Sequence, residues 1–224
     1  EAAIDTKDIT KKDLYLARME TELTRMEDMT TAFLEYAGME RQGFHLKYEL
    51  VDIDHFLHTI NDDFQSLAEQ HKVKLSYQAS PAFINQKVTL SLDFHWCYRA
   101  IQNLLSNAMQ YANNTVVISA YCQHNFLHIS VEDDGKGIAG ENIENIFAPF
   151  VKLDVDRSRE LGHFGLGLAI SAKVVHWHNG SIHASNILAT NNKNSAKTTK
   201  QVNKNATITG ARFTISLPLQ TEKN

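Results

Sequence analysis

Two runs of alternating apolar and polar residues constrain the fold of this 224-residue chain more strongly than any other feature. They span residues 115–121 and 126–131, with Gln123-His124-Asn125 between them. Such alternation is typical of half-buried strands, and two runs around a short polar turn predict a β-hairpin. Helix-like segments flank the hairpin on both sides, so we expect a chain of mixed α and β structure.

Residue spacing predicts the remaining elements. Apolar residues at helical spacing favour helices over 52–70, over the segment after Asp93, and from Gly167 to about His176. Asp93 is a suitable N-cap for the second of these helices. Alternating runs predict strands at 73–78, 88–92, 181–185 and 212–217. The polar stretch 191–205 predicts a surface loop rather than a linker, because strand-like sequence resumes after it.

The first part of the chain carries a seven-residue apolar repeat. A first set recurs at Leu16, Leu23, Thr30 and Ala37, and a second follows three places behind at Met19, Met26 and Phe33. The repeat predicts one long helix over 12–42 that ends at Gly38 and Gly43. Two interpretations stay open here. The helix either lies with its apolar side on a core, or forms half of a helical hairpin that pairs or dimerises.

Composition excludes several classes of protein. Hydrophobic residues at 43% and charged residues at 21% suit a globular chain, and 22 basic against 26 acidic residues give no footprint for nucleic acid. Cys97 and Cys122 form no CxxC pattern, which argues against a disulfide scaffold or a zinc ribbon and fits a reducing compartment. No signal peptide or run of about 18 apolar residues is present. Because the sequence begins at Glu1, we expect a fragment of a longer protein.

Asn103-Leu-Leu-Ser-Asn107 places two amides one turn apart on one face of the predicted helix. An amide oxygen is a hard ligand that suits magnesium, and because it is neutral it does not repel phosphate. The pair can equally be ordinary surface asparagines. Tyr111, one turn further, can stack on a base or belong to the core.

The segment Val131-Glu-Asp-Asp-Gly-Lys-Gly-Ile138 follows directly from the second hairpin strand. Its DxGxG pattern combines Asp133 with Gly135 and Gly137, and glycines permit left-handed turns and close approach of a ligand. A fixed carboxylate accepts a hydrogen bond from the amine of adenine and repels the carbonyl of guanine. A tight acidic turn without a ligand is the alternative.

A second glycine-rich segment, Gly162-His-Phe-Gly165-Leu-Gly167-Leu, opens the predicted helix at 167. Free backbone N–H groups at a helix start suit a polyphosphate. The segment is neither a Walker loop, since no Gly-Lys-Ser/Thr follows, nor a dinucleotide fingerprint, since no strand precedes it. Before it, Ile146-Phe147-Ala-Pro-Phe150-Val-Lys152 leads into a charged stretch, which is interpreted as a lid over bound phosphates or as a solvated loop.

In this order, the four motifs resemble the catalytic, ATP-binding domain of sensor histidine kinases, within the gyrase, Hsp90, histidine kinase and MutL ATP-binding fold. Residues 103–107 are similar to the N box, 133–137 to the G1 box, 147–150 to the F box and 162–167 to the G2 box. Gly210-Ala-Arg-Phe213, with Leu217-Pro218, is similar to the closing strand. The resemblance covers about residues 50–220 and implies an α+β fold, a two-layer α/β sandwich with ATP bound between helices and a lid.

The resemblance also implies a role for each matching residue. Asn107 would hold Mg²⁺, with Asn103 in support or at a phosphate, and Asp133 would read adenine beside Tyr111. The lid would bring Lys152 and Arg157 to the phosphates. The residues implied to bind ATP and Mg²⁺ are Asn103, Asn107, Tyr111, Asp133, Gly135, Gly137, Ile138, Lys152, Arg157, Gly162, Gly165, Leu166 and Gly167.

The phosphoacceptor of this family is absent from the sequence. It is a histidine in a His-Glu/Asp-Leu-Arg-Thr-Pro-like context, and none of the eleven histidines has that context. The resemblance divides the chain into 1–45, part of the dimerisation and phosphotransfer hairpin, and 46–224, the ATP-binding domain. Residues 1–11 resemble the end of the first hairpin helix and its turn, so we expect the acceptor just upstream. Two further departures are Gln110, where the family often has a basic residue, and His163, which replaces a common glycine.

The function implied is transfer of the γ-phosphoryl group of ATP to a histidine, for relay to a response regulator. The intact protein is expected to be a homodimer and the cytoplasmic part of a bacterial inner-membrane sensor. One alternative is a hydrolytic or conformational ATPase, but its general-base glutamate would stand at Asn103, and an amide cannot take a proton from water. Another alternative is a non-catalytic nucleotide-binding scaffold, which Gln110 and His163 favour.

Overall fold

The computed structural model describes residues 6–41, 43–140, 143, 145–151, 165–189 and 207–219. The helices are α1 (Thr6–Gly38), α2 (Ile53–Asp63), α3 (Gln65–Gln70), α4 (Pro81–Gln86), α5 (Phe94–Tyr111) and α7 (Gly167–Trp177). The strands are β1 (Glu49–Asp52), β2 (Lys74–Ala79), β3 (Thr89–Leu92), β4 (Thr115–Gln123), β5 (Phe126–Asp133), β6 (Ser181–Leu188) and β7 (Ile208–Pro218).

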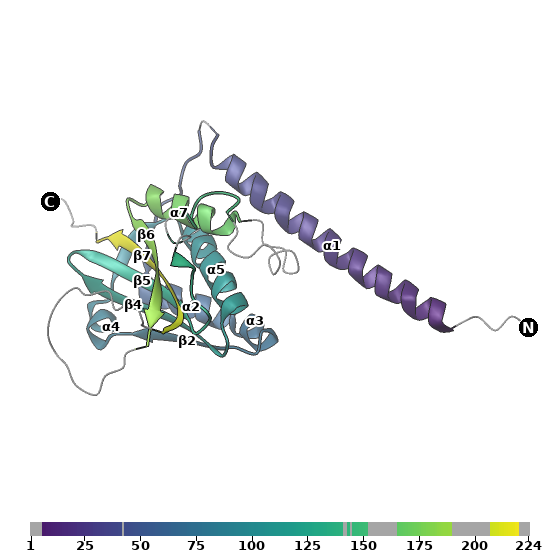
Figure 1. Cartoon of the computed structure of the whole chain (residues 1–224). Coiled ribbons are helices and arrows are strands. Elements are labelled where there is room, and N and C mark those ends of the chain that lie inside the picture. Colours follow the sequence, from purple (N-terminus) through teal and green to yellow (C-terminus); the bar gives the residue numbers. More distant parts are fainter. Residues whose placement is uncertain are drawn as a thin grey trace, which may run out of the picture.

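One mixed sheet forms the first layer of the fold. In the described part of the chain its strands follow the order β2-β4-β5-β7-β6. Strand β2 pairs parallel to β4, and all other neighbours are antiparallel. Helices α2, α5 and α7 form the second layer (Figure 1). The predicted two-layer α/β sandwich is therefore confirmed, as is the hairpin of β4 and β5, whose turn residues His124 and Asn125 both have positive φ.

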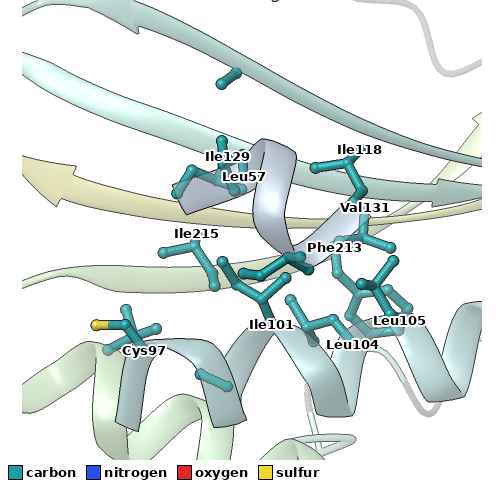
Figure 2. Close-up of a cluster of buried hydrophobic side chains, with 14 of the residues drawn as sticks. Leu57, Cys97, Ile101, Leu104, Leu105, Ile118, Ile129, Val131, Phe213 and Ile215 are labelled. Carbon is teal, nitrogen blue, oxygen red and sulfur yellow. The ribbon is translucent and has the colours of Figure 1, made fainter. Parts of the chain in front are cut away.

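The core lies between the sheet and α5. Ile118, Val131 and Phe213 point from three neighbouring strands toward Ile101 and Leu105 on α5 (Figure 2). All five side chains are at most 2% exposed. Burying one face of the sheet and one side of the helix is the main stabilising contribution in such a fold, at roughly 25 cal/mol for each Å² of apolar surface. The strand that leads into the DxGxG segment is thus held rigidly.

Short elements depart from the sequence prediction. Strand β3 pairs with β1 in a separate two-stranded sheet, and β1 was not predicted because only Val51 of its four residues is buried. Helix α4 was also missed, although its Ser80 side chain accepts a hydrogen bond from the Phe83 N–H and Pro81 follows this cap. A helix of six residues is too short for apolar periodicity to reveal it.

Helix α1 corrects the predictions made for the start of the chain. It runs without interruption from Thr6 to Gly38, so residues 6–11 continue the long helix and are not the end of another helix and its turn. The reason is visible in the sequence, since Ile9 extends the heptad of Leu16 and no glycine or proline interrupts it. The helix ends at Gly38, the first of the two glycines that were predicted to end it.

The apolar seam of α1 does not lie on the core. Leu16, Met19, Leu23 and Met26 are between 48% and 65% exposed, and the helix projects away from the sandwich (Figure 1). The interpretation of α1 as an amphipathic helix on the core is therefore wrong. Within the described ranges, none of the helices combines the length and apolar content that a bilayer crossing requires.

In the part of the chain that the structure describes, the last turns of α1 and the segment that follows contact the sandwich. Glu35 accepts two hydrogen bonds from the Arg99 guanidinium on α5, at 3.1 and 3.0 Å, and Glu40 pairs with Lys173 on α7. Phe44 stacks on Trp177, with 4.5 Å between ring centroids, and meets Trp96 edge-on. These contacts attach the base of α1 to both helices that, further along, carry the candidate site.

His178 connects the end of α7 to the start of α5. Its Nε2 accepts a hydrogen bond of 2.9 Å from the Asp93 backbone N–H, and its Nδ1 lies 2.8 Å from the Val174 carbonyl oxygen. Because a carbonyl only accepts, Nδ1 carries the proton and the buried ring is neutral. Burial lowers the pKa of His178 below its usual value, against the opposing effects of Val174 and Asp93. The predicted Asp93 N-cap is confirmed, with its Oδ1 accepting from the Trp96 N–H at 3.0 Å.

We expect His178→Gln to reduce the acid sensitivity of the fold. An unfolded histidine binds a proton near pH 6.5, whereas His178 in the native state stays neutral to lower pH. The stabilisation is therefore present above about pH 6.5 and is lost as pH falls, at up to about 1.4 kcal/mol per pH unit. Urea unfolding at pH 7.5 and 5.5 measures this slope. The exposed His183→Gln is the control, and an unchanged slope in His178→Gln would contradict the assignment.

Candidate functional site

A pocket of about 250 Å³ opens between α5, the loop after β5 and strand β7. Its lining is contributed by Asn107, Tyr111, Asp133, Lys136, Gly137, Ile138, Ala139, Ile208, Ala211 and Phe213. Five of the residues predicted to bind a ligand are in this lining, although they come from two separate motifs. The structure therefore joins the Asn103–Asn107 motif and the DxGxG motif in one concave site.

Asp133 is the last residue of β5 and lies at the base of the pocket, only 4% exposed. Its Oδ1 accepts hydrogen bonds from the backbone N–H groups of Gly135, at 2.9 Å, and Ala211, at 3.4 Å. Burial raises the pKa of Asp133, and the two N–H groups partly oppose that shift. Since both of these bonds involve Oδ1, the carboxylate has one fixed orientation that leaves Oδ2 available to a ligand.

Two glycines of the DxGxG loop stand where no side chain fits. A Cβ at Gly135 would lie 2.2 Å from the Tyr111 carbonyl oxygen. A Cβ at Gly137 would lie 2.4 Å from Ile208 Cγ2, and its φ of +74° is one that other residues rarely adopt. The loop can therefore pass between α5 and β7 only with glycine at both positions.

The two asparagines of α5 share a face of the helix but make different contacts. Asn107 lines the pocket, whereas Asn103 donates a hydrogen bond of 3.0 Å from Nδ2 to the Gly167 carbonyl oxygen at the start of α7. Ser171 donates to the same oxygen, also at 3.0 Å. The Asn103 bond ties the second glycine-rich segment to α5, and the Asn103 amide oxygen takes no part in it.

The start of α7 has backbone groups that suit an anion. The residue at its N-cap position, Leu166, is buried and its side chain makes no capping hydrogen bond to the first turn. The Phe150 backbone N–H donates to the Gly165 carbonyl oxygen at 2.9 Å, which brings the aromatic segment against this helix start. Phe147 meets Phe213 edge-on, with 6.4 Å between ring centroids. The predicted residues Lys152, Arg157 and Gly162 lie outside the described residues.

Asp134 supports the site in a way that the sequence did not reveal. Its Oδ1 accepts hydrogen bonds from the backbone N–H groups of Asn113, Asn114 and Thr115, at 2.8 to 3.1 Å. Burial raises its pKa, but these N–H groups together hold the pKa of Asp134 below its usual value. The carboxylate thereby joins the end of α5 to the loop that follows Asp133.

Comparison with known proteins places this geometry in a family. Residues 92–221, which carry α5 and both glycine-rich segments, match the family model described as "Histidine kinase-, DNA gyrase B-, and HSP90-like ATPase". This match covers more than half of the chain. The chain belongs to this ATPase family. It carries the ATP-binding catalytic domain of the histidine kinase type, as the order of its motifs predicted.

Curated relatives and solved structures agree with this ATPase family. The sensor protein RstB of Escherichia coli is 30% identical over 88% of the chain, and the sensor histidine kinase WalK of Bacillus subtilis is 30% identical over 84%. The chain spans 40% of RstB and 30% of WalK. The crystal structure of full-length ShkA in complex with AMPPNP shares the fold, with a TM-score of 0.71 and 19% identity over 94% of this chain and 39% of that one.

Proposed function

We propose that this chain is the ATP-binding catalytic portion of a sensor histidine kinase that transfers the γ-phosphoryl group of ATP to a histidine. The orientation of Asp133 carries the proposal, because its two backbone bonds direct one carboxylate oxygen to a ligand at the base of the pocket. That oxygen accepts a hydrogen bond from the exocyclic amine of adenine and repels a carbonyl at the same position. Tyr111 and Ile138 flank the base in this proposal.

The phosphates would extend from the adenine toward the start of α7. Its first backbone N–H groups, positioned near Gly165, Leu166 and Gly167, are suited to oxyanions. The negative charge of a polyphosphate also needs cations, and we assign Lys152 and Arg157 to this task by their place in the lid motif. Gln110 would add a neutral donor on α5, since its buried Nε2 has no hydrogen-bond partner among the residues that the structure describes.

The residues of α5 fit Mg²⁺ bound together with phosphate. Asn107 would hold the ion through its amide oxygen. Asn103, on the preceding turn of α5, would support this binding. The described residues contain no group of three His, Cys, Asp or Glu side chains able to hold a metal without the nucleotide. Magnesium typically keeps few protein ligands and completes its shell with phosphate oxygens and waters. When bound, the ion neutralises charge on the transferred phosphoryl group.

A kinase agrees better with this site than a hydrolase. Hydrolysis needs a general base beside the attacking water, and the general-base glutamate of a hydrolytic ATPase would stand at Asn103. Its Nδ2 already donates a hydrogen bond to the Gly167 carbonyl oxygen, so the side chain serves as a support between two helices. A purely non-catalytic scaffold is favoured only by Gln110 and His163, whereas the pocket retains Asn107 and Asp133.

The remaining parts of the proposal concern the intact protein. Residues 1–45 would belong to the dimerisation and phosphotransfer hairpin and 46–224 to the ATP-binding domain. The exposed seam of α1 would pair in a homodimer, and a response regulator would receive the phosphoryl group. RstB and WalK are named as sensor proteins, and the chain spans less than half of each. We therefore place it on the cytoplasmic side of a bacterial inner membrane.

The chain is expected to bind nucleotide without labelling itself. Calorimetric titration with ADP and Mg²⁺ should show binding at one site, because the pocket residues are all present. Incubation with γ-labelled ATP should leave the chain unlabelled and release phosphate slowly, because it has neither an acceptor histidine in context nor a base at Asn103. Acid-labile label on this chain would show that one of its own eleven histidines is an acceptor, and rapid hydrolysis would contradict the choice of a kinase over a hydrolase.

A further inference from the structure

Asn186 occupies a core-facing position of β6, on the same face of the strand as Ile182 and Ala184. Its Oδ1 accepts a hydrogen bond from the Ile138 backbone N–H, and its Nδ2 donates one to the Ile138 carbonyl oxygen. Both bonds measure 2.7 Å. One side chain thus satisfies both backbone groups of a residue in the loop after β5, as a neighbouring strand would.

This pair of bonds fixes the wall of the pocket. Ile138 is 3% exposed and lines the pocket, but it lies outside the strands, so the sheet ladder does not hold it. The preceding residue, Gly137, is packed against the same side chain, since a Cβ there would lie 2.6 Å from Asn186 Oδ1. On the neighbouring strand β7, Asn186 is opposite Ala211, whose N–H is bonded to Asp133.

We propose that Asn186 is a positioning residue for nucleotide binding, acting through the Ile138 backbone to hold the pocket wall at the distance an adenine ring requires. This inference rests on the proposed function of the pocket. The nucleotide does not need to touch Asn186 for the effect to occur. Removing both bonds leaves a buried N–H and a buried carbonyl without partners, so the loop shifts to hydrate them and the wall is lost.

Asn186→Leu tests the bonds separately from packing, because leucine has nearly the same shape but no polar atoms. We expect the affinity for ADP, measured by calorimetry, to fall by about tenfold or more. The amide hydrogen of Ile138 should exchange much faster, whereas the amides of β4 and β5 keep their protection. Asn61→Leu is the matched control, since among the described residues the Asn61 side chain bonds its neighbour Asp62 on α2 and does not line the pocket.

The outcomes separate this inference from the proposed function. If the unmodified chain binds ADP and Asn186→Leu binds it within twofold, Asn186 does not position the pocket. If the substitution lowers protection equally across the sheet, the residue is structural and the inference also fails. If the unmodified chain does not bind ADP, the proposed function fails, and the exchange of the Ile138 amide still decides whether Asn186 holds the loop.

Discussion

Asp133→Asn is expected to abolish adenine-nucleotide binding without destabilising the fold. The backbone N–H groups of Gly135 and Ala211 both point at one oxygen of this side chain, so they would take the amide oxygen of the asparagine. The Nδ2 group would then face the ligand and oppose the amine of adenine, donor against donor. A mismatch of this kind in a buried site reduces affinity by orders of magnitude.

The stability of this variant follows from the direction of the pKa shift at Asp133. Burial raises the pKa of Asp133 above its unfolded value, so ionisation is less favourable in the native state than in the unfolded state. The contribution of protonated Asp133 to the free energy of unfolding is present in acid and is lost as pH rises through the native pKa. Asparagine does not ionise, and we therefore expect an equal or higher melting temperature at pH 7.5.

Calorimetry with ADP and thermal unfolding at pH 7.5 measure the two effects on the same samples. The adjacent Asp134→Asn is an informative control. The pKa of Asp134 is lowered, so its ionised carboxylate stabilises the fold at pH values above the unfolded pKa. Asp134→Asn should therefore lower the melting temperature at pH 7.5. Retained ADP affinity in Asp133→Asn would remove this carboxylate from the base-recognition site.

Sequence patterns were sufficient where a local rule determines the structure. The alternation around His124 and Asn125 predicted the hairpin, and the Asp93 cap with its apolar spacing predicted α5. Gly135 and Gly137 predicted a turn that a ligand can approach closely, and the structure adds that a Cβ would overlap the Tyr111 carbonyl at Gly135 and the Ile208 side chain at Gly137. Each of these patterns is formed by residues near one another in the chain, although the Ile208 side chain that Gly137 approaches is distant in sequence.

Contacts between distant segments escaped prediction. Asn186 lies 48 residues from Ile138 in sequence, and nothing in the strand pattern distinguishes it from an ordinary polar residue. Its one possible signal is that it stands where alternation calls for an apolar side chain. The bond from Asn103 to Gly167 spans 64 residues and requires that α5 and α7 pack side by side. Only the assembled fold specifies these pairs.

Asn107→Ala is expected to remove the magnesium dependence of nucleotide binding. In the unmodified chain, Mg²⁺ should tighten ADP binding, because the amide oxygen of Asn107 and the phosphates share the ion. Without this ligand, the affinity for ADP in Mg²⁺ should fall by about 10- to 100-fold, to nearly the value measured with a chelator. Phosphotransfer in the intact kinase should be lost, since the charge of the phosphoryl group is no longer neutralised.

Asn103→Ala distinguishes a ligand from its support on the same face of α5. It removes the bond to the Gly167 carbonyl oxygen and should lower the free energy of unfolding by about 1 kcal/mol, with weaker ADP binding both with and without Mg²⁺. The ratio of the two affinities should therefore persist in Asn103→Ala and approach one in Asn107→Ala. Titrations of each variant in Mg²⁺ and in a chelator measure this ratio directly. If Asn107→Ala kept the ratio of the unmodified chain, the metal would lie elsewhere, and Asn107 would only line the pocket.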